Sequence, residues 1–178
     1  MKRKQFLATS AMGIGLCAIN PIKAASSKDE KAIMNPKLVR KEEGQQQIVM
    51  GDLQNIKLIG SDTNGQFTLI EQYNEPGFGI PPHVHENEDE VFQVLTGQLE
   101  ITVGGKTSTL TAGDIAFCPR GIPHGFKVTG EEKARVMLSV FPSGIEKMFD
   151  ELAHLPPGPP DLEKVGEICG RYQITFLK

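Results

Sequence analysis

The sequence predicts an all-β domain, a barrel or sandwich of short strands followed by a short helical tail. Between about residues 45 and 142, short apolar runs alternate with turn residues at spacings of about 8–12 residues, which is typical of this class. The 178 residues suffice for one domain with its own core, and the 19 glycines are scattered, as many turns require. The formal net charge of −3 argues against a nucleic-acid partner, which would need a basic face.

Residues 1–25 are predicted to be a cleavable export signal. Positions 2–4 are basic, residues 6–19 form an uncharged and largely apolar run, and small residues follow at 24 and 25, which is the order of such signals. The apolar run is too short for a membrane span, which needs about 20 residues. The basic start resembles a twin-arginine signal with lysine in place of the second arginine. We therefore expect an exported protein, periplasmic or secreted, in which the polar residues 26–44 form a flexible linker.

The strands of the expected barrel are separated by recognisable turns. Apolar runs of strand length are residues 66–73, 91–95, 99–103 and 107–110. Gly104 and Gly105 lie between the last two runs, and a Gly-Gly pair suits a two-residue hairpin turn. Four phenylalanines, at positions 67, 92, 117 and 126, are candidates either to line an apolar pocket or to pack in an ordinary core.

Residues 143–178 are predicted to form a helical extension that packs on the outside of the barrel. Ser143 and Glu146 have the spacing of a capping box. One apolar stripe follows at Ile145, Met148, Phe149 and Leu152. Asp161 can cap a second helix, whose inward residues would be Leu162, Val165 and Ile168. We interpret Met148 and Phe149 as packing residues rather than cofactor contacts.

Two cysteines lie outside the predicted signal, Cys118 and Cys169. A disulfide between them is compatible with an exported protein. Two buried free thiols are an equally good interpretation, and the sequence does not choose between them.

Three histidines and a glutamate form a metal-binding pattern. His83 and His85 alternate along a predicted strand, so both side chains point to the same face. Pro81 and Pro82 cannot donate to a strand ladder, so we expect this strand to lie at a sheet edge or to begin there. Glu90 opens the next strand. If its face also points inward, the carboxylate lies beside the two imidazoles.

The spacing of these residues resembles the two conserved motifs of the cupin superfamily. The first motif is matched by Gly77, His83, His85, Glu90 and Gly97. The second is matched by Gly113, Pro119, Gly121 and His124, with Val128 where asparagine is usual. Nine residues in register are a specific signal, and the resemblance covers residues 45–142. It implies a jelly-roll β-barrel, with residues 143–178 as its helical tail.

The resemblance implies one divalent transition metal (Fe, Mn, Ni, Co, Cu or Zn) held by His83, His85, Glu90 and His124. Four protein ligands leave two positions of an octahedral ion open for an anionic oxygen, O₂ or water. Glu86, Glu88 and Asp89 are expected to form a solvated acidic loop. Asp89 could compete with Glu90 as a ligand, but the family pattern places glutamate at this spacing. The fourth histidine outside this pattern, His154, is expected at the surface.

The tail, from residues 149–152 through the proline-rich residues 157–161 to Arg171 and Tyr172, also resembles the helical tail of single-domain quercetin-dioxygenase-like cupins. This likeness implies a metal-dependent oxidoreductase, a dioxygenase that acts on a small enol, phenol or flavonol-like substrate with O₂ as a candidate co-substrate. Glu90 would accept the substrate proton and so is the candidate catalytic residue. Two alternatives remain open, namely a metal-dependent isomerase or epimerase of a sugar or polyol, and a non-catalytic module that binds a metal or small molecule. The sequence also leaves open whether the chain forms a homodimer.

Overall fold

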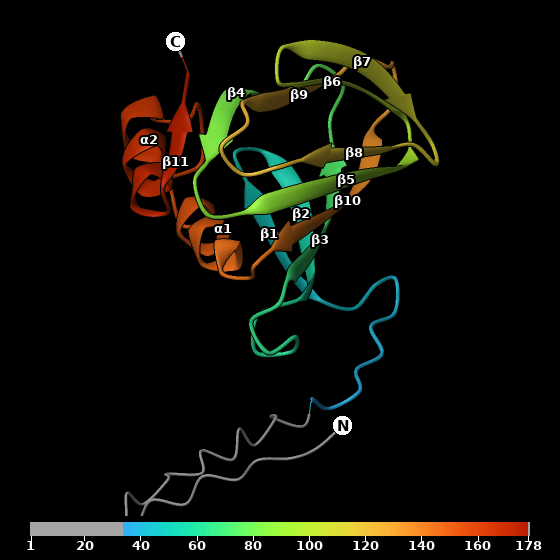
Figure 1. Ribbon diagram of the computed structural model, residues 1–178, viewed down its shortest axis with the longest axis vertical. Helices are drawn as coiled ribbons and strands as arrows, with labels where there is room; N and C mark the ends of the chain where they lie inside the picture. The colour runs from blue at the N-terminus through green and yellow to red at the C-terminus, as the bar shows by residue number, and fades with distance from the viewer. Residues whose placement is uncertain (1–33, 178) are drawn as a thin grey trace, which may run out of the picture. The chain divides into compact units, whose positions relative to one another are not determined.

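A computed structural model of the chain describes residues 34–177 (Figure 1), so the predicted export signal at residues 1–25 lies outside the described part. The described strands form two antiparallel sheets. The six-stranded sheet has the order β1 (Gln45–Val49), β2 (Asp52–Leu58), β3 (Thr68–Asn74), β10 (Ala134–Phe141), β5 (Asp89–Thr96) and β8 (Ile115–Cys118). The five-stranded sheet has the order β11 (Ile174–Phe176), β4 (Gly79–His85), β9 (His124–Val128), β6 (Gln98–Val103) and β7 (Lys106–Thr111). This arrangement confirms the predicted all-β jelly roll.

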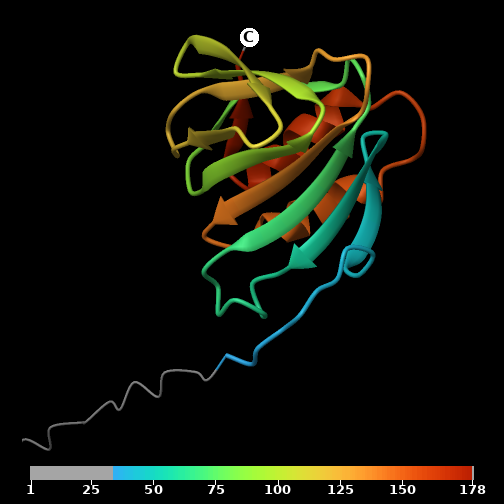
Figure 2. The same ribbon diagram turned by 90° about the vertical axis from the view of Figure 1, so that its right-hand side faces the viewer.

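The hydrophobic core lies between the inner faces of the two sheets. Strand β10 illustrates the pattern, because its buried residues alternate with partly exposed ones along the whole strand. Its neighbours β3 and β5 run alongside it (Figure 2), and all three turn β-branched or aliphatic side chains inward. Val94, Val136 and Val140 are fully buried. Each such side chain stabilises the fold by about 1.5–3 kcal/mol relative to an exposed one.

Glycines of the two motifs are required by the backbone at two places near the site. Gly97 has a φ of +79°, and a Cβ there would lie 2.7 Å from the Lys133 carbonyl oxygen. Gly121 has a φ of +72°, and its N–H donates to the His85 carbonyl oxygen at 2.8 Å. The second contact ties the loop before β9 to the end of β4, so the two motifs are held together by main-chain geometry.

The segment before β1 is attached to the outer face of the six-stranded sheet. The Nζ of Lys57 donates to the carbonyl oxygens of Lys41 and Glu43 at 2.5 and 2.9 Å. The Asn55 amide also donates to the Glu43 carbonyl, at 3.2 Å. Residues 40–44, the last part of the segment expected to be a linker, are therefore anchored to β2.

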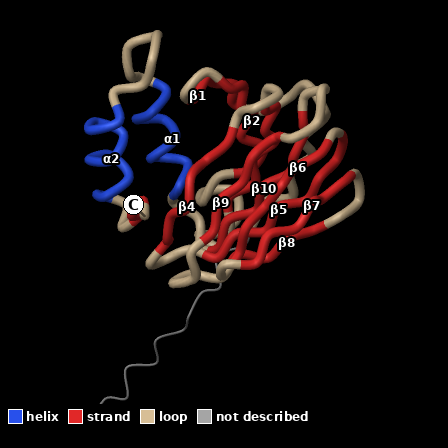
Figure 3. The backbone as a smooth tube through the Cα atoms, turned by 90° about the horizontal axis from the view of Figure 1, so that it is seen from above, coloured by secondary structure: helices blue, strands red, loops and turns tan. Residues whose placement is uncertain are grey.

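The helical tail consists of α1 (Ile145–Ala153) and α2 (Leu162–Arg171), which lie side by side at one end of the strands, next to β1 and β4 (Figure 3). The predicted cap of α2 is confirmed, because the Asp161 carboxylate accepts from the N–H groups of Glu163 and Lys164. Val165 and Ile168 are buried as expected. Neither helix has the length and apolar composition that a membrane crossing requires.

Two details of the helices differ from the prediction. Gly144, not Ser143, is the N-cap of α1, because the Glu146 carboxylate accepts from the Gly144 N–H at 2.7 Å and no side chain caps the helix. Leu162 is 72% exposed rather than inward, since it opens the first turn of α2, before the helix reaches the barrel.

Cys118 and Cys169 are free thiols in the described structure, and both are buried. Burial raises the pKa of Cys118 to about 12 and that of Cys169 to about 11. Of the two interpretations of these cysteines, that of two buried free thiols is therefore confirmed.

Candidate metal centre

The four predicted site residues come together between the two sheets. His83 and His85 lie on β4 and His124 on β9, its neighbour in the five-stranded sheet, where His83 and His124 are register partners. Glu90 reaches them from β5 in the six-stranded sheet. All four side chains are between 2% and 6% exposed, and their candidate ligand atoms lie within 4.8 Å of one another. We call these four residues the His–Glu cluster.

The two prolines before the histidines lie in a β-bulge. The pairing of β4 with β9 shifts register between Ile80 and His83, where β4 carries one extra residue. The sequence predicted that these prolines lie in an edge strand or at the beginning of a strand. Instead they lie within β4, and β4 is not an edge strand because β11 pairs with it over His83–His85. Pro81 and Pro82 are tolerated because β11 begins to pair beyond them and the bulge leaves no ladder N–H missing.

Hydrogen bonds to the imidazoles define which nitrogen faces the cluster. The Nδ1 of His83 lies 2.9 Å from the Pro81 carbonyl oxygen, and the Nδ1 of His124 lies 3.1 Å from the Ile122 carbonyl oxygen. A carbonyl oxygen only accepts, so each Nδ1 carries a proton and the Nε2 of each ring faces the cluster.

The Glu90 carboxylate faces the Nε2 atoms of His124 and His85. Its Oε2 lies 3.0 Å from the Nε2 of His124, and its Oε1 lies 3.8 Å from the Nε2 of His85. Two lone pairs at 3.0 Å repel each other unless a cation lies between them. The cluster is therefore built to hold either a proton or a metal ion at this point.

Burial and mutual charge shift the pKa values of the cluster. Burial lowers the pKa of His83 to about 4, so this ring is neutral near pH 7. Burial alone would also lower the pKa of His85, but the Glu90 and Glu88 carboxylates raise it. Burial would raise the pKa of Glu90, yet the three neighbouring histidines outweigh it and lower that pKa. The carboxylate is accordingly ionised, and the cluster attracts cations.

Glu88 does not lie in a solvated loop, as the sequence suggested. Its side chain is buried, and its Oε2 lies 3.4 Å from the Nδ1 of His85 without good hydrogen-bond geometry. The turn between β4 and β5 folds this carboxylate back behind His85, on the side away from Glu90. Glu88 thus stands where a carboxylate can orient a metal-binding imidazole, a role that sequence spacing alone did not reveal.

The other charged residues near the cluster point elsewhere. Asp89 accepts from the main-chain N–H and the guanidinium of Arg120, with the closest contact at 2.7 Å, so it does not compete with Glu90. Glu86 is exposed, as expected. The imidazole of His154 is 77% exposed, which also agrees with its expected surface position.

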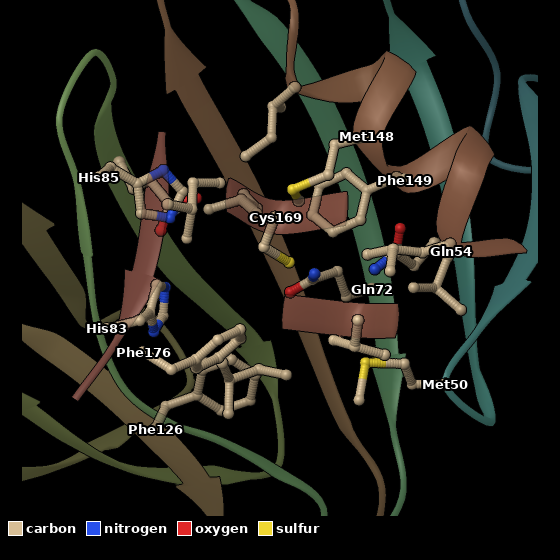
Figure 4. Close-up of a pocket in the computed structure, with 18 of the residues that line it drawn as sticks. Met50, Gln54, Gln72, His83, His85, Phe126, Met148, Phe149, Cys169 and Phe176 are labelled. Atoms are coloured by element: carbon tan, nitrogen blue, oxygen red, sulfur yellow. The ribbon is translucent and has the colours of Figure 1, made fainter. Parts of the chain in front are cut away.

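A cavity of about 80 Å³ opens beside the His–Glu cluster (Figure 4). Of the four candidate phenylalanines, Phe92 and Phe126 line it, whereas Phe117 is 57% exposed and Phe67 packs on Phe141. The tail helices also line it, with Met148, Phe149, Leu152, Val165 and Cys169. The tail therefore covers the end of the barrel and shapes the cavity, instead of packing only on the outer surface.

Two glutamines also line the cavity, and the sequence reading did not single them out. Gln54 on β2 and Gln72 on β3 are register partners and each is 5% exposed. The available signal was their position, since each occupies an inward slot next to an isoleucine two residues along the same strand, Ile56 on β2 and Ile70 on β3.

The fold and the His–Glu cluster together are those of a cupin. A model of the cupin domain matches residues 71–141. Over 150 residues the chain is 27% identical to quercetin 2,3-dioxygenase of Bacillus subtilis (strain 168), a match that covers 80% of this chain but only 44% of that enzyme. It is 32% identical over 104 residues to an uncharacterized protein of Aquifex aeolicus (strain VF5), covering 58% of this chain and 77% of that protein.

A solved structure supports the same fold. KdgF from Halomonas sp. superposes with a TM-score of 0.56 at 20% sequence identity, covering 64% of this chain and 99% of that one. The chain thus belongs to the cupin family, and it resembles the quercetin-dioxygenase-like members. It spans less than half the length of the quercetin dioxygenase that it matches.

Proposed function

We propose that His83, His85, Glu90 and His124 bind one divalent transition metal, and that the chain is a metal-dependent oxidoreductase of the dioxygenase class acting on a small enol or phenol. The observation that carries this proposal is the convergence of four acceptor atoms within 4.8 Å at one end of a largely apolar cavity. The likeness to quercetin 2,3-dioxygenase favours oxidation over the other reactions that this fold supports.

The donor set fits a transition metal. Three neutral imidazole nitrogens and one carboxylate suit Fe, Mn, Co, Ni, Cu or Zn better than Ca²⁺ or Mg²⁺, which prefer oxygen ligands. The Nδ1 contacts of His83 and His124 with main-chain carbonyls fix the tautomer that a metal requires. When bound, such an ion would supply Lewis-acid and redox chemistry to a substrate oxygen.

The protein's own residues would handle the proton and exclude water. Glu90 is the only carboxylate among the described residues that line the cavity. An enol or phenol whose O–H enters the cavity therefore finds one base within reach, and an ionised one. Phe92, Phe126 and Leu138 surround this position with apolar surface, which keeps water away from the oxygen anion that remains.

The size of the cavity argues for a small substrate. About 80 Å³ is roughly half of the ~150 Å³ that holds a benzene ring in a protein interior, and far below the ~300–1,000 Å³ of drug-sized sites. A flavonol would need α1 and α2 to move. A single-ring phenol also exceeds a cavity of this size, so we expect small enols to react before single-ring phenols, and single-ring phenols before flavonols.

The test has two stages. Elemental analysis of protein purified from its native host should find about one transition metal per chain, and His85→Ala should lose most of it while staying folded. His154→Ala removes an exposed histidine and serves as the matched control, which should keep its metal. Full metal occupancy in His85→Ala would refute the ligand assignment.

The second stage is O₂ consumption by metal-loaded protein with a panel of small enols, phenols and flavonols. Metal-dependent O₂ uptake with at least one small member is the expected result. Turnover of sugars or polyols without O₂ would replace the dioxygenase by the isomerase or epimerase. Tight metal binding without turnover of any panel member would favour the non-catalytic binding module.

A further inference from the structure

Two buried amides lie at the end of the cavity opposite the His–Glu cluster. Figure 4 shows Gln54 and Gln72 on one side of the pocket and His83 and His85 on the other, with apolar side chains and Cys169 between them. Both glutamines are 95% buried. The Oε1 of each has no hydrogen-bond partner in the described structure, although each lines the cavity.

An unpartnered buried amide is costly for a folded protein. Leaving a buried acceptor without a hydrogen bond costs about 1–3 kcal/mol, and few such groups occur in native structures. Here two occur as register partners on the inner face of β2 and β3, next to aliphatic residues such as Ile56 and Ile70. An apolar side chain of similar length would fill the same space without that cost. This pair is therefore best explained by a group that enters the cavity.

The register gives the span between the two ends. Glu90 lies level with Val140, and Val140 with Thr68, so Gln72 is two strands across and four residues along from Glu90. Strand geometry makes this about 10 Å across and about 13 Å along, or about 16 Å between the two Cα atoms. The side chains at both ends take up part of this distance, which leaves room for a molecule a few carbon atoms long.

The charges define what each end accepts. Among residues 34–177, no ionised side chain lines the cavity apart from the His–Glu cluster, so a charged group beside the glutamines would be buried without a counterion. A hydroxyl group suits the amides best, because it donates to an amide oxygen and accepts from an amide N–H. Phe92, Leu138 and Phe126 define an apolar middle between the two polar ends.

We propose that Gln54 and Gln72 form a second recognition subsite, which binds an uncharged hydroxyl group at the far end of a substrate whose oxygen anion lies at the metal. The ligand is thus a short molecule with two different polar ends and an apolar middle. The position of the anionic end rests on the proposed function, whereas the hydroxyl subsite rests on the two glutamines alone.

Calorimetry with matched ligand pairs tests this subsite. The probes are 4-hydroxybutanoate, 5-hydroxypentanoate and 6-hydroxyhexanoate, each compared with the acid that lacks the hydroxyl, on protein loaded with redox-inert Zn²⁺. At the chain length that spans the cavity, the hydroxy acid should bind about 5–10-fold more tightly than its partner, the effect of one net hydrogen bond. Gln54→Met and Gln72→Met should abolish this preference, whereas Gln93→Met, at an exposed position of β5, should keep it.

The possible outcomes separate the two proposals. Equal binding within every pair, with both acids requiring the metal, overturns the subsite and leaves the metal centre standing. If the acids bind His85→Ala as tightly as they bind the zinc-loaded protein, the metal centre is overturned. In that case, a preference for the hydroxy acid that depends on Gln54 and Gln72 still supports the subsite. Thermal unfolding gives a readout without ligand, because Tm should stay or rise in both Gln→Met variants. A fall in Tm would mean that the amides hold the fold together, and would overturn the subsite.

Discussion

Two buried charged clusters lie on opposite faces of the six-stranded sheet, and they are built in opposite ways. On the outer face, the Glu71 carboxylate lies 3.2 Å from the Nζ of Lys57 and 2.7 Å from the Nε of Arg135, the latter as a charge contact without hydrogen-bond geometry. The remaining protons of Lys57 go to main-chain carbonyls of residues 40–44. We call Lys57, Glu71 and Arg135 the outer cluster.

The difference lies in what the converging atoms can offer. In the outer cluster, two cationic side chains meet one carboxylate and main-chain carbonyl acceptors, so donors face acceptors within the chain. In the His–Glu cluster, acceptor lone pairs converge on one another, as the 3.0 Å contact between His124 and Glu90 shows. Lys57 and Glu71 are buried about as deeply as the His–Glu cluster, although Arg135 is 34% exposed, so burial alone does not identify a functional site. A buried cluster whose acceptors converge needs a proton or a metal ion between them, whereas a cluster in which donors face acceptors needs no additional ion.

The largest effect is expected for Glu90→Gln, which keeps the shape of the side chain but removes its charge and basicity. At matched metal content, turnover of any substrate found by O₂ consumption should fall by about 10²–10⁴-fold, or about 3–5 kcal/mol of transition-state stabilisation. The free energy of unfolding should change far less. Near-equal turnover in the two proteins would eliminate the proton-accepting role and reduce Glu90 to a ligand.

Lys57→Met should have the converse effect, on stability without any effect on the site. The variant leaves the buried Glu71 carboxylate with Arg135 and removes the donor to three main-chain carbonyls, and loss of one partner of a buried ion pair costs about 3–5 kcal/mol. Urea denaturation measures this, with Lys106→Met at an exposed position as control, and metal content should be unchanged. A loss of metal in Lys57→Met would break the distinction between the two clusters.

The His–Glu cluster was predictable because its signals are local. His83 and His85 share a face through the two-residue period of a strand, and Gly97 and Gly121 mark turns that need a positive φ. The ligand set itself came from the family resemblance, which also implied that Glu90 and His124 would join them. Short-range spacing was sufficient for the turns and for the cap of α2 as well.

The outer cluster and the glutamine pair were not predictable for a physical reason. Lys57, Glu71 and Arg135 meet only through the pairing of β2, β3 and β10, and that pairing brings together residues far apart in the sequence. Local periodicity predicts which face of a sheet a residue lies on, but it does not predict which residue lies beside it on the next strand. Gln54 and Gln72 illustrate the same limit, because each alone resembles an ordinary strand residue.

A smaller effect is expected for Glu88→Gln. The Glu88 carboxylate contacts the His–Glu cluster only through the Nδ1 of His85, on the side of the ring away from Glu90. With a metal bound, the Nδ1–H of His85 has Glu88 as its nearest acceptor, at 3.4 Å. Loss of such a partner typically weakens metal affinity by about 10–100-fold. Competition with a chelator measures the affinity, and Glu86→Gln on the exposed side of the same turn is the matched control. Unchanged affinity in both variants would mean that Glu88, although buried, does not help to orient His85.

The smallest effect is expected for Glu146→Gln. The Glu146 carboxylate is partly buried, and its hydrogen-bond donors are uncharged. It accepts from the Thr68 hydroxyl at 2.5 Å and from the N–H groups of Gly144 and Gly60 at 2.7 and 3.1 Å. Burial would raise the pKa of Glu146, but these hydrogen bonds, led by that of Thr68, lower it below 4.5. The variant should lose about 1–2 kcal/mol of unfolding free energy at pH 7, less than Lys57→Met, since no charge is orphaned.

The pH dependence of this loss follows from the sign of the shift. A carboxylate whose pKa is lower in the folded state contributes stability that is fully present above its unfolded pKa, near 4.5, and is lost as the pH falls through the folded value. The stability difference between wild type and Glu146→Gln should therefore be constant from pH 7 to about pH 5 and shrink below that. Urea denaturation at a series of pH values checks it. A difference that persists undiminished at acid pH would mean that Glu146 acts through its shape rather than its charge. In that case, hydrogen bonds from uncharged donors to the ionised Glu146 carboxylate would not explain its contribution to stability.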